Sequence, residues 1–427
     1  MAVAAGPREI QVRVTGAAAT TPGLAGPRLA MRVLVPFACG YFLSYLIRNV
    51  NAVIAPDLLA AFSLDASDLG LLTSVYFLGF FLFQPVLGLL LDRFGPRRVE
   101  GSLLLVAGAG ALIFGLSANV TMLVVGRGLI GLGVCACLMA AFQANSLWYP
   151  RERLPAINGW ILSAGGIGVV ASTAPVEWLL HWIDWRTLFI AFAAAFAVVS
   201  AMLFALVPER PGTAQAASLR EQFRGFVAVW KTPEFWRIAP LVMFSQSSYM
   251  SIQGLWAARW MKDVGGFTRE VIAEHLLLAA IAMVAGHLIM GNLASWVGRR
   301  GIAPSYVAGI GVGIAIAVQI LIAGGYTEMQ TAVWLLFGFL GTAGTVCFAI
   351  LAQAFPIAMA GRANTALNLA LFATTFIVQW GMGGIVNRFP LAGGGYAAQG
   401  YAIAFGIMAV LQAIALVWFF RRMRRPA

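Results

Sequence analysis

The chain has 427 residues, of which 61% are hydrophobic and only 10% are charged, and its formal net charge is +12. Soluble domains average about 45–50% apolar and about 25% charged residues. The composition therefore excludes a string of soluble domains and predicts an all-α membrane protein in a lipid bilayer. Most arginines lie in short connections between apolar runs, where positive charge sets membrane orientation, so we expect no nucleic-acid partner.

Residues 1–31 contain many small residues and lack the continuous apolar core of a signal peptide, which predicts a disordered cytoplasmic tail. All four cysteines fall within apolar runs and show no metal-ligand spacing, so we expect no metal, disulfide or cofactor.

Apolar runs long enough to cross the bilayer divide into six and six. The first six lie near 33–60, 69–91, 99–117, 121–144, 156–180 and 186–207. The second six lie near 237–260, 271–297, 302–323, 330–355, 361–386 and 400–420. This pattern predicts a bundle over 32–207, a linker with an amphipathic interfacial helix over 208–236, a second bundle over 237–420, and a basic cytoplasmic tail over 421–427.

The first run carries an arginine at mid-depth, where an ionisable side chain usually marks a functional site. Helical spacing places this arginine on one face with polar and aromatic neighbours, which indicates a water-filled cavity. A guanidinium there suits a carboxylate or phosphate of a ligand; a structural arginine paired with carbonyls or a carboxylate of the protein is the alternative. The predicted substrate residues of this face are Tyr41, Ser44, Tyr45, Arg48 and Asn51.

The connection between the second and third runs reads Gly88-Leu-Leu-Leu-Asp92-Arg93-Phe94-Gly95-Pro96-Arg97-Arg98. A carboxylate among arginines at helix ends can accept charge-assisted hydrogen bonds. We predict that this cluster latches the two halves in the outward-facing state and breaks in the inward-facing one. The alternative is that its arginines only orient the hairpin.

The fourth run contains Arg127-Gly-Leu-Ile-Gly131-Leu-Gly133. No carboxylate is expected at mid-depth in any run; the nearest acids are Asp57, Glu177 and Glu274. His287, near the middle of the eighth run, is the remaining group that titrates near neutral pH.

The seventh run matches the first in position, and its polar and aromatic side chains recur at intervals of three, four and three residues. Amides beside aromatic rings fix polar ligands in apolar pockets, although they also join helices. The predicted substrate residues of the seventh run are Gln246, Tyr249, Gln253 and Trp256. Weaker candidates in other runs are Gln143, Asn364, Asn368 and Gln379.

A degraded copy of the hairpin starts 203 residues after Gly88, at Gly291, and includes Gly298, Arg299 and Arg300 but has Ser295 in place of the acid. The copy indicates two homologous halves, a common plan of transporters. Of 28 Lys and Arg residues, 21 fall on the predicted N-terminal side, two lie within the runs, and five lie opposite. Both termini are therefore predicted to be cytoplasmic.

Gly88 to Arg98 fits the loop signature of the major facilitator superfamily at every fixed position, and the chain resembles that family over residues 31–425. The fourth-run motif and Asp184-Trp185-Arg186 resemble two further family patterns, and Tyr45 to Asn49 resembles a pattern of its organic-anion branches. The resemblance implies twelve helices in two pseudo-symmetric six-helix bundles and a proton-coupling role for Arg127.

These observations predict a secondary active transporter of a small organic anion, working by alternating access in the cell inner (plasma) membrane. Protons are one candidate coupling ion, with Arg127 and His287 as the candidate residues. An exchanger without protons and an efflux carrier for amphipathic compounds remain alternatives. No nucleophile–base pair is apparent, so we expect no enzyme, and we expect a monomer.

Overall fold

The computed structural model describes residues 27–150, 153–209 and 227–423, and within them the chain is helical apart from one β-bridge between Pro390 and Tyr396. The first half contains α1 (Pro27–Leu29), a π-helical turn η1 (Ala30–Leu34), α2 (Val35–Asn49), α3 (Asn51–Phe62), α4 (Ala66–Gly115), α5 (Val120–Val134), α6 (Cys137–Trp148), α7 (Leu154–Ala171), α8 (Ala174–Leu179) and α9 (Trp185–Leu206). The second half contains α11 (Pro233–Ser251), a π-helical turn η3 (Ile252–Trp256), α12 (Ala257–Asp263), α13 (Arg269–Arg299), α14 (Pro304–Ala323), α15 (Gln330–Leu340), a 3-10 turn η4 (Ala343–Thr345), α16 (Val346–Gln353), α17 (Ile357–Val386) and α18 (Ala398–Met423).

The helices give the predicted number of membrane passes. Nine helical segments of the described chain are long and apolar enough to span a bilayer. One of them, α4, makes two passes because it bends at Gly95, whose φ of 78° and ψ of 161° are not helical. The remaining two passes are α7 with α8, and α11 with η3 and α12.

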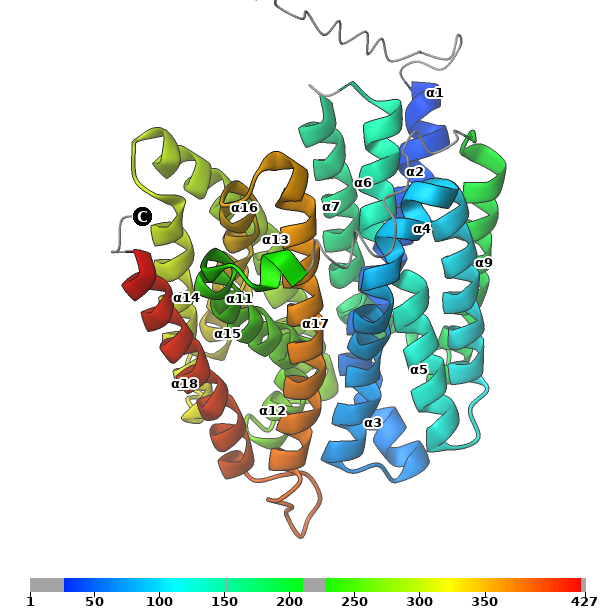
Figure 1. The fold of residues 1–427 in the computed structure, drawn as a ribbon. Coiled ribbons are helices and arrows are strands. Elements are labelled where there is room, and N and C mark those ends of the chain that lie inside the picture. The colour runs from blue at the N-terminus through cyan, green and yellow to red at the C-terminus, as the bar shows by residue number, and fades with distance from the viewer. Residues whose placement is uncertain (1–26, 151–152, 210–226, 424–427) are drawn as a thin grey trace, which may run out of the picture.

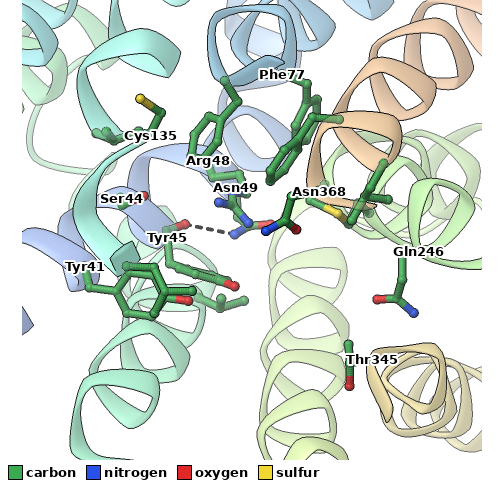
Figure 2. A pocket seen from close by; sticks show the side chains of 18 of the residues that line it. Tyr41, Ser44, Tyr45, Arg48, Asn49, Phe77, Cys135, Gln246, Thr345 and Asn368 are labelled. Carbon is green, nitrogen blue, oxygen red and sulfur yellow. Dashed lines mark hydrogen bonds between the residues drawn. The ribbon is translucent and has the colours of Figure 1, made fainter. Parts of the chain in front are cut away.

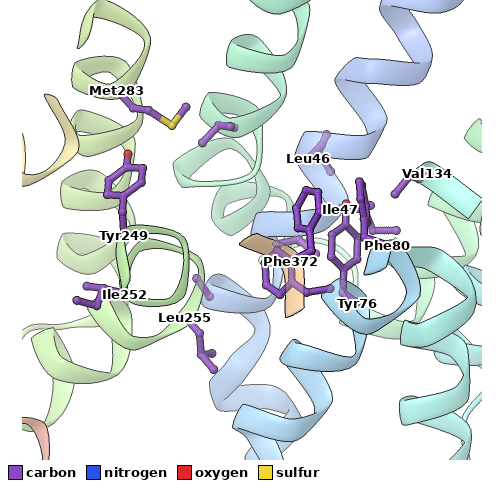
Figure 3. Packing of buried hydrophobic residues seen from close by; sticks show 14 of the residues in the cluster. Leu46, Ile47, Tyr76, Phe80, Val134, Tyr249, Ile252, Leu255, Met283 and Phe372 are labelled. Atoms are coloured by element: carbon purple, nitrogen blue, oxygen red, sulfur yellow. The ribbon is translucent and has the colours of Figure 1, made fainter. Parts of the chain in front are cut away.

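The two halves form separate bundles that lie side by side and meet where α4 packs against α17 and α7 packs against α13 (Figure 1). In the interface, Phe372 of α17 lies 4.8 Å, centroid to centroid, from Phe80 of α4, which in turn packs against Tyr76 (Figure 3). The wall between the halves is therefore aromatic at this level.

Two helix starts on the side opposite the arginine hairpin, those of α4 and α9, are capped by acids in the connections. The Asp65 carboxylate accepts a hydrogen bond from the Asp68 backbone N–H, and the Asp68 carboxylate accepts one from the Asp65 backbone N–H. At the start of α9, hydrogen bonds from Thr187 hold the pKa of the Asp184 carboxyl below its usual range. These caps satisfy backbone groups that the first helical turn leaves free.

Four passes are interrupted at equivalent places in the two halves. The first pass breaks at Val50, and the seventh contains the π-turn that ends at Trp256, 206 residues later. The fourth breaks at Cys135 and the tenth at Gly341, also 206 residues apart. Irregular backbone at membrane depth is tolerated where protein or a water-filled cavity surrounds it, so these breaks locate the functional centre.

The predicted boundaries of the bundles differ from the observed helices in two places. Helical structure already begins at Pro27, within the predicted 1–31 tail, and α18 continues to Met423, into the predicted 421–427 tail. Most of the predicted 208–236 linker lies outside the described residues, so its amphipathic helix stays a prediction.

Candidate functional site

A cavity of about 480 Å³ lies between the halves, next to the helix breaks. Most of the predicted substrate residues meet there: Tyr41, Ser44, Tyr45 and Arg48 come from α2, and Gln246, Tyr249 and Gln253 come from the seventh pass (Figure 2). The other predicted polar candidates that line it are His287, Asn364, Asn368 and Gln379. One cavity thus combines residues more than 200 positions apart in the sequence.

Two predicted substrate residues lie behind the cavity wall. Asn51 is buried and its amide donates to the Thr73 hydroxyl at 3.3 Å. Trp256 is fully buried and its indole N–H donates to the Gln379 backbone carbonyl at 3.3 Å. The breaks in the first and seventh passes turn these side chains off the face that helical spacing assigns to them.

Among the described residues that line the cavity, Arg48 is the one with a permanently charged side chain. Its Nε lies 3.4 Å from the Tyr76 hydroxyl, and its Cζ lies 4.4 Å from the centre of the Tyr45 ring. No carboxylate of the described residues forms an ion pair with it, and none lines the cavity. A cation held by aromatic rings and a hydroxyl keeps donors for an anionic ligand.

Arg127 has a different environment. Its side chain is fully buried outside the cavity lining, and its two terminal nitrogens donate to the carbonyls of Ile47 at 2.8 Å and Arg48 at 2.9 Å. These carbonyls precede the break at Val50, where the helical bonding pattern is interrupted. Arg127 therefore satisfies the broken end of α2 and sets the backbone position of Arg48.

The second half contributes neutral hydrogen-bonding groups. Gln246 donates to the Gly341 carbonyl at 2.8 Å, which joins α11 to the break of the tenth pass. By contrast, neither amide atom of Gln379 has a partner among the described residues, nor does the side-chain carbonyl of Gln253. His287 lines the cavity, and its Nδ1 lies 3.0 Å from the Met283 carbonyl of its own helix.

Some lining residues and supports were missed in the sequence. Asn49, Thr73, Gln84 and Thr345 line the cavity. Tyr76 holds Arg48 through its hydroxyl and faces Arg127 with its ring, 4.9 Å from the guanidinium carbon. A tyrosine in an apolar run resembles any core aromatic residue, so only the packing of α4 against α2 reveals its role.

At the end opposite the arginine hairpin, here called the outer end, polar contacts join the halves. Arg269, which begins α13, binds Asp57 of α3 and Glu177 of α8, each at 2.7 Å. Nearby, Asn387 donates to the Asp65 carboxylate at 2.9 Å. We call the cluster of Arg269, Asp57 and Glu177 the outer gate; its ion pairs join the two halves.

The hairpin at the inner end makes its contacts within the first half. The Asp92 carboxylate accepts a hydrogen bond from Gln143 at 3.3 Å, while Arg97 and Arg98 reach Glu209. Arg93 is exposed and lies over the ring of Phe94. No ion pair joins this hairpin to the second half within the described residues.

The second copy of the hairpin turns at a glycine that lies just after the copied motif. Gly291 and Gly298 are both helical within α13, and the residue with φ of 78° is Gly301. Arg299 and Arg300 therefore precede the turn, whereas Arg97 and Arg98 follow it. Arg300 stacks over Trp296, 3.8 Å from the ring centre. The turn glycines, Gly95 and Gly301, are again 206 residues apart.

Residues 37–379 match the family model described as Major Facilitator Superfamily. The chain belongs to the Major Facilitator Superfamily. It is a multi-pass membrane protein and a secondary transporter, not an enzyme, and the predicted fold class is confirmed.

Two bacterial relatives are similar in sequence. The probable sulfoacetate transporter of Cupriavidus necator is 25% identical over 275 residues, which cover 61% of this chain and 64% of that protein. The hexuronate transporter of Escherichia coli strain K12 is 22% identical over 282 residues, which again cover 61% of this chain and 64% of that protein. The matched region spans less than two thirds of either relative.

Among solved structures, a bacterial homologue of the human lysosomal transporter Spinster, in an inward-facing and unoccupied conformation, has the same fold. Its TM-score is 0.74 at 19% identity, over 93% of this chain and 97% of that chain. At this identity the similarity concerns the fold alone. The substrate of the present chain has to be inferred from its own cavity.

Proposed function

We propose that this transporter carries a small organic anion whose acidic group binds Arg48. The observation that carries the proposal is the charge of the cavity: Arg48 lies in it without a carboxylate partner among the described residues. A cation with free donors in a partly apolar cavity favours a ligand of opposite charge. The relatives named for sulfoacetate and hexuronate support the same class, since both names denote organic anions.

The neutral amides of the second half suit the remainder of such a ligand. Gln379 and Gln253 have unpartnered polar atoms in the cavity lining, and an unpaired buried amide is costly unless a ligand or water satisfies it. We assign the acidic end of the substrate to Arg48 and its polar body to this opposite wall.

Alternating access supplies the movement. We propose that the structure represents the conformation closed at the outer gate, and that the Asp92 cluster closes the inner end when the gate opens. Arg93, Arg97 and Arg98 provide the positive charges of that latch. In this proposal the halves rotate about the central cavity, where the four helix breaks lie.

The test is uptake by proteoliposomes of monocarboxylates, sugar acids, sulfonates and organophosphates, each with and without a pH gradient. For the substrate that is found, Arg48→Lys is expected to weaken binding by about tenfold to a hundredfold, since losing one charged hydrogen bond costs about 1.5–3 kcal/mol. Arg388→Lys, at an exposed position outside the cavity, is the matched control. Unchanged affinity in Arg48→Lys would refute the assignment.

The aromatic lining suggests a second candidate function, efflux of amphipathic compounds. Phe77, Phe80, Phe142, Phe348 and Phe372 all border the cavity. This function does not require the guanidinium, so Arg48→Ala would leave dye efflux intact while abolishing uptake of organic anions. Efflux that survives the substitution, with no anion uptake in the wild type, would favour this candidate.

A further inference from the structure

Glu100 is a buried acid that the sequence pattern does not single out. It lies in α4, five residues after the bend at Gly95, and its side chain is fully buried. The prediction that the acids stay in connections, tails or near the ends of the apolar runs does not anticipate this burial. Neither carboxyl oxygen has a hydrogen-bonding partner of the ordinary N–H or O–H kind among the described residues.

Three helices enclose the Glu100 carboxyl. Gly40 of α2 faces it so closely that a methyl group on Gly40 would overlap one carboxyl oxygen. The thiol of Cys137, on α6, is the neighbouring titratable group. On its own helix, the Arg97 guanidinium is directed to the Phe204 carbonyl and to Glu209. No cation of the described residues pairs with Glu100.

This environment admits the acid but not its anion. A carboxylate removed from water needs a cation or several donors, and a weak thiol donor is no substitute. The carboxyl therefore holds its proton in this conformation. Any conformation that admits water between α2, α4 and α6 would favour release of that proton.

The same helices hold the substrate site. Gly40, Ser44 and Arg48 follow each other at four-residue intervals along α2, so one face of this helix borders both Glu100 and the cavity. On α6, Cys137 directly precedes Leu138, which lines the cavity. Movement of α2 or α6 on binding an anion at Arg48 would thus change the packing around Glu100.

We propose that Glu100 is the proton-binding site of this transporter, protonated while α2, α4 and α6 are packed together and losing its proton to cytoplasmic water when they separate. The proposal rests on the proposed function, because it couples this proton to the movement of an anion. It assigns to Glu100 the role that the sequence suggests for Arg127 and His287. In this assignment, Arg127 only positions the backbone of α2.

Glu100→Gln tests the proposal because glutamine approximates the shape of the neutral acid but does not titrate. In proteoliposomes, we expect the variant to exchange substrate across the membrane at close to the wild-type rate. Accumulation of substrate driven by a pH gradient is expected to fall by about tenfold or more, because the proton no longer shifts the equilibrium between the two conformations. A pH-sensitive dye inside the vesicles should report no proton movement with substrate.

Two matched variants complete the experiment. Glu274→Gln alters an exposed acid of α13 and should behave like the wild type. His287→Gln tests the histidine that lines the cavity. Wild-type accumulation and proton movement in Glu100→Gln, or loss of coupling in His287→Gln alone, would overturn the proposal.

A direct measurement covers the case in which the variant does not fold. Infrared difference spectra of the wild-type protein, recorded between high and low pH with substrate, should contain the C=O stretch of a protonated carboxylic acid that Glu100→Asp shifts. No such band in the wild type would overturn the proposal. Absence of anion exchange in the wild type would instead refute the proposed function, while anion exchange without any response to pH would refute the proton site alone.

Discussion

Arg48 and Arg127 are both cations within the first half, but their hydrogen-bonding partners differ and indicate different roles. The two terminal nitrogens of Arg127 donate to the two carbonyls at the broken end of α2, whereas Arg48 has a tyrosine hydroxyl and aromatic rings around it. Buried donors and acceptors have to be paired, so the break in α2 and Arg127 require each other. The guanidinium that remains available to a ligand is that of Arg48.

This difference leads to a prediction at the residue scale. Arg127→Lys retains the charge but cannot reach two carbonyls with a planar fork, so it should lower the free energy of unfolding by about 2 kcal/mol. Thermal unfolding in detergent measures the effect, and Arg299→Lys, at an exposed position, serves as the control. A variant as stable as the wild type would mean that Arg127 does not hold the break.

At the scale of elements, glycines set how closely the helices approach. Gly131 of α5 lies against the backbone of Tyr76 in α4, and Gly79 of α4 lies against the backbone around Gly128 and Leu132. A side chain at either glycine would separate the two helices. Because Tyr76 touches both arginines, the spacing of α4 and α5 also sets the position of Arg48.

The corresponding prediction compares two glycines in helices. Gly131→Ala should destabilise the protein by about 1–3 kcal/mol, since overpacking forces backbone shifts, and should also weaken substrate binding. Gly159→Ala, where an added methyl group meets no neighbour within 4 Å, should be neutral or stabilising by up to about 1 kcal/mol. Unfolding and uptake are measured for both. Equal behaviour of the two variants would contradict the close approach.

At the scale of the whole molecule, the two ends differ in how the halves are joined. The outer gate and the Asp65–Asn387 contact cross between the halves, whereas no bond of the Asp92 hairpin among the described residues reaches the second half. Gly70 and Gly383 bring α4 and α17 close together at the outer end. The balance between the outer contacts and the inner latch would set which side is open.

Variants at the two ends should shift this balance in opposite directions. Arg269→Gln removes the outer gate, so a cysteine introduced by Ala258→Cys should react about tenfold faster with an impermeant maleimide from outside. Asp92→Asn weakens the latch, so labelling should slow and transport should be lost, while substrate binding persists. Arg388→Gln is the control. Wild-type labelling in Arg269→Gln would exclude the gate, and wild-type uptake in Asp92→Asn would exclude the latch.

Much of the architecture followed from local patterns. Apolar runs of membrane length, a hairpin signature and its copy were sufficient to predict twelve passes in two halves, because each pass satisfies its own backbone and needs little from its neighbours. Arg48, Tyr45 and Gln253 were found for a similar reason: a polar side chain at membrane depth is costly enough to be informative wherever it occurs.

Other features were decided only when the helices packed. The break at Val50 turned Asn51 away from the cavity, the turn of the second hairpin moved to Gly301, and Glu100 became buried against Gly40. None of these follows from periodicity, because each depends on a neighbouring helix far away in the chain. The sequence by itself determined which arginines enter the membrane. The tertiary structure decided which of them are paired and which acid is buried, because pairing and burial depend on side chains that distant helices bring together.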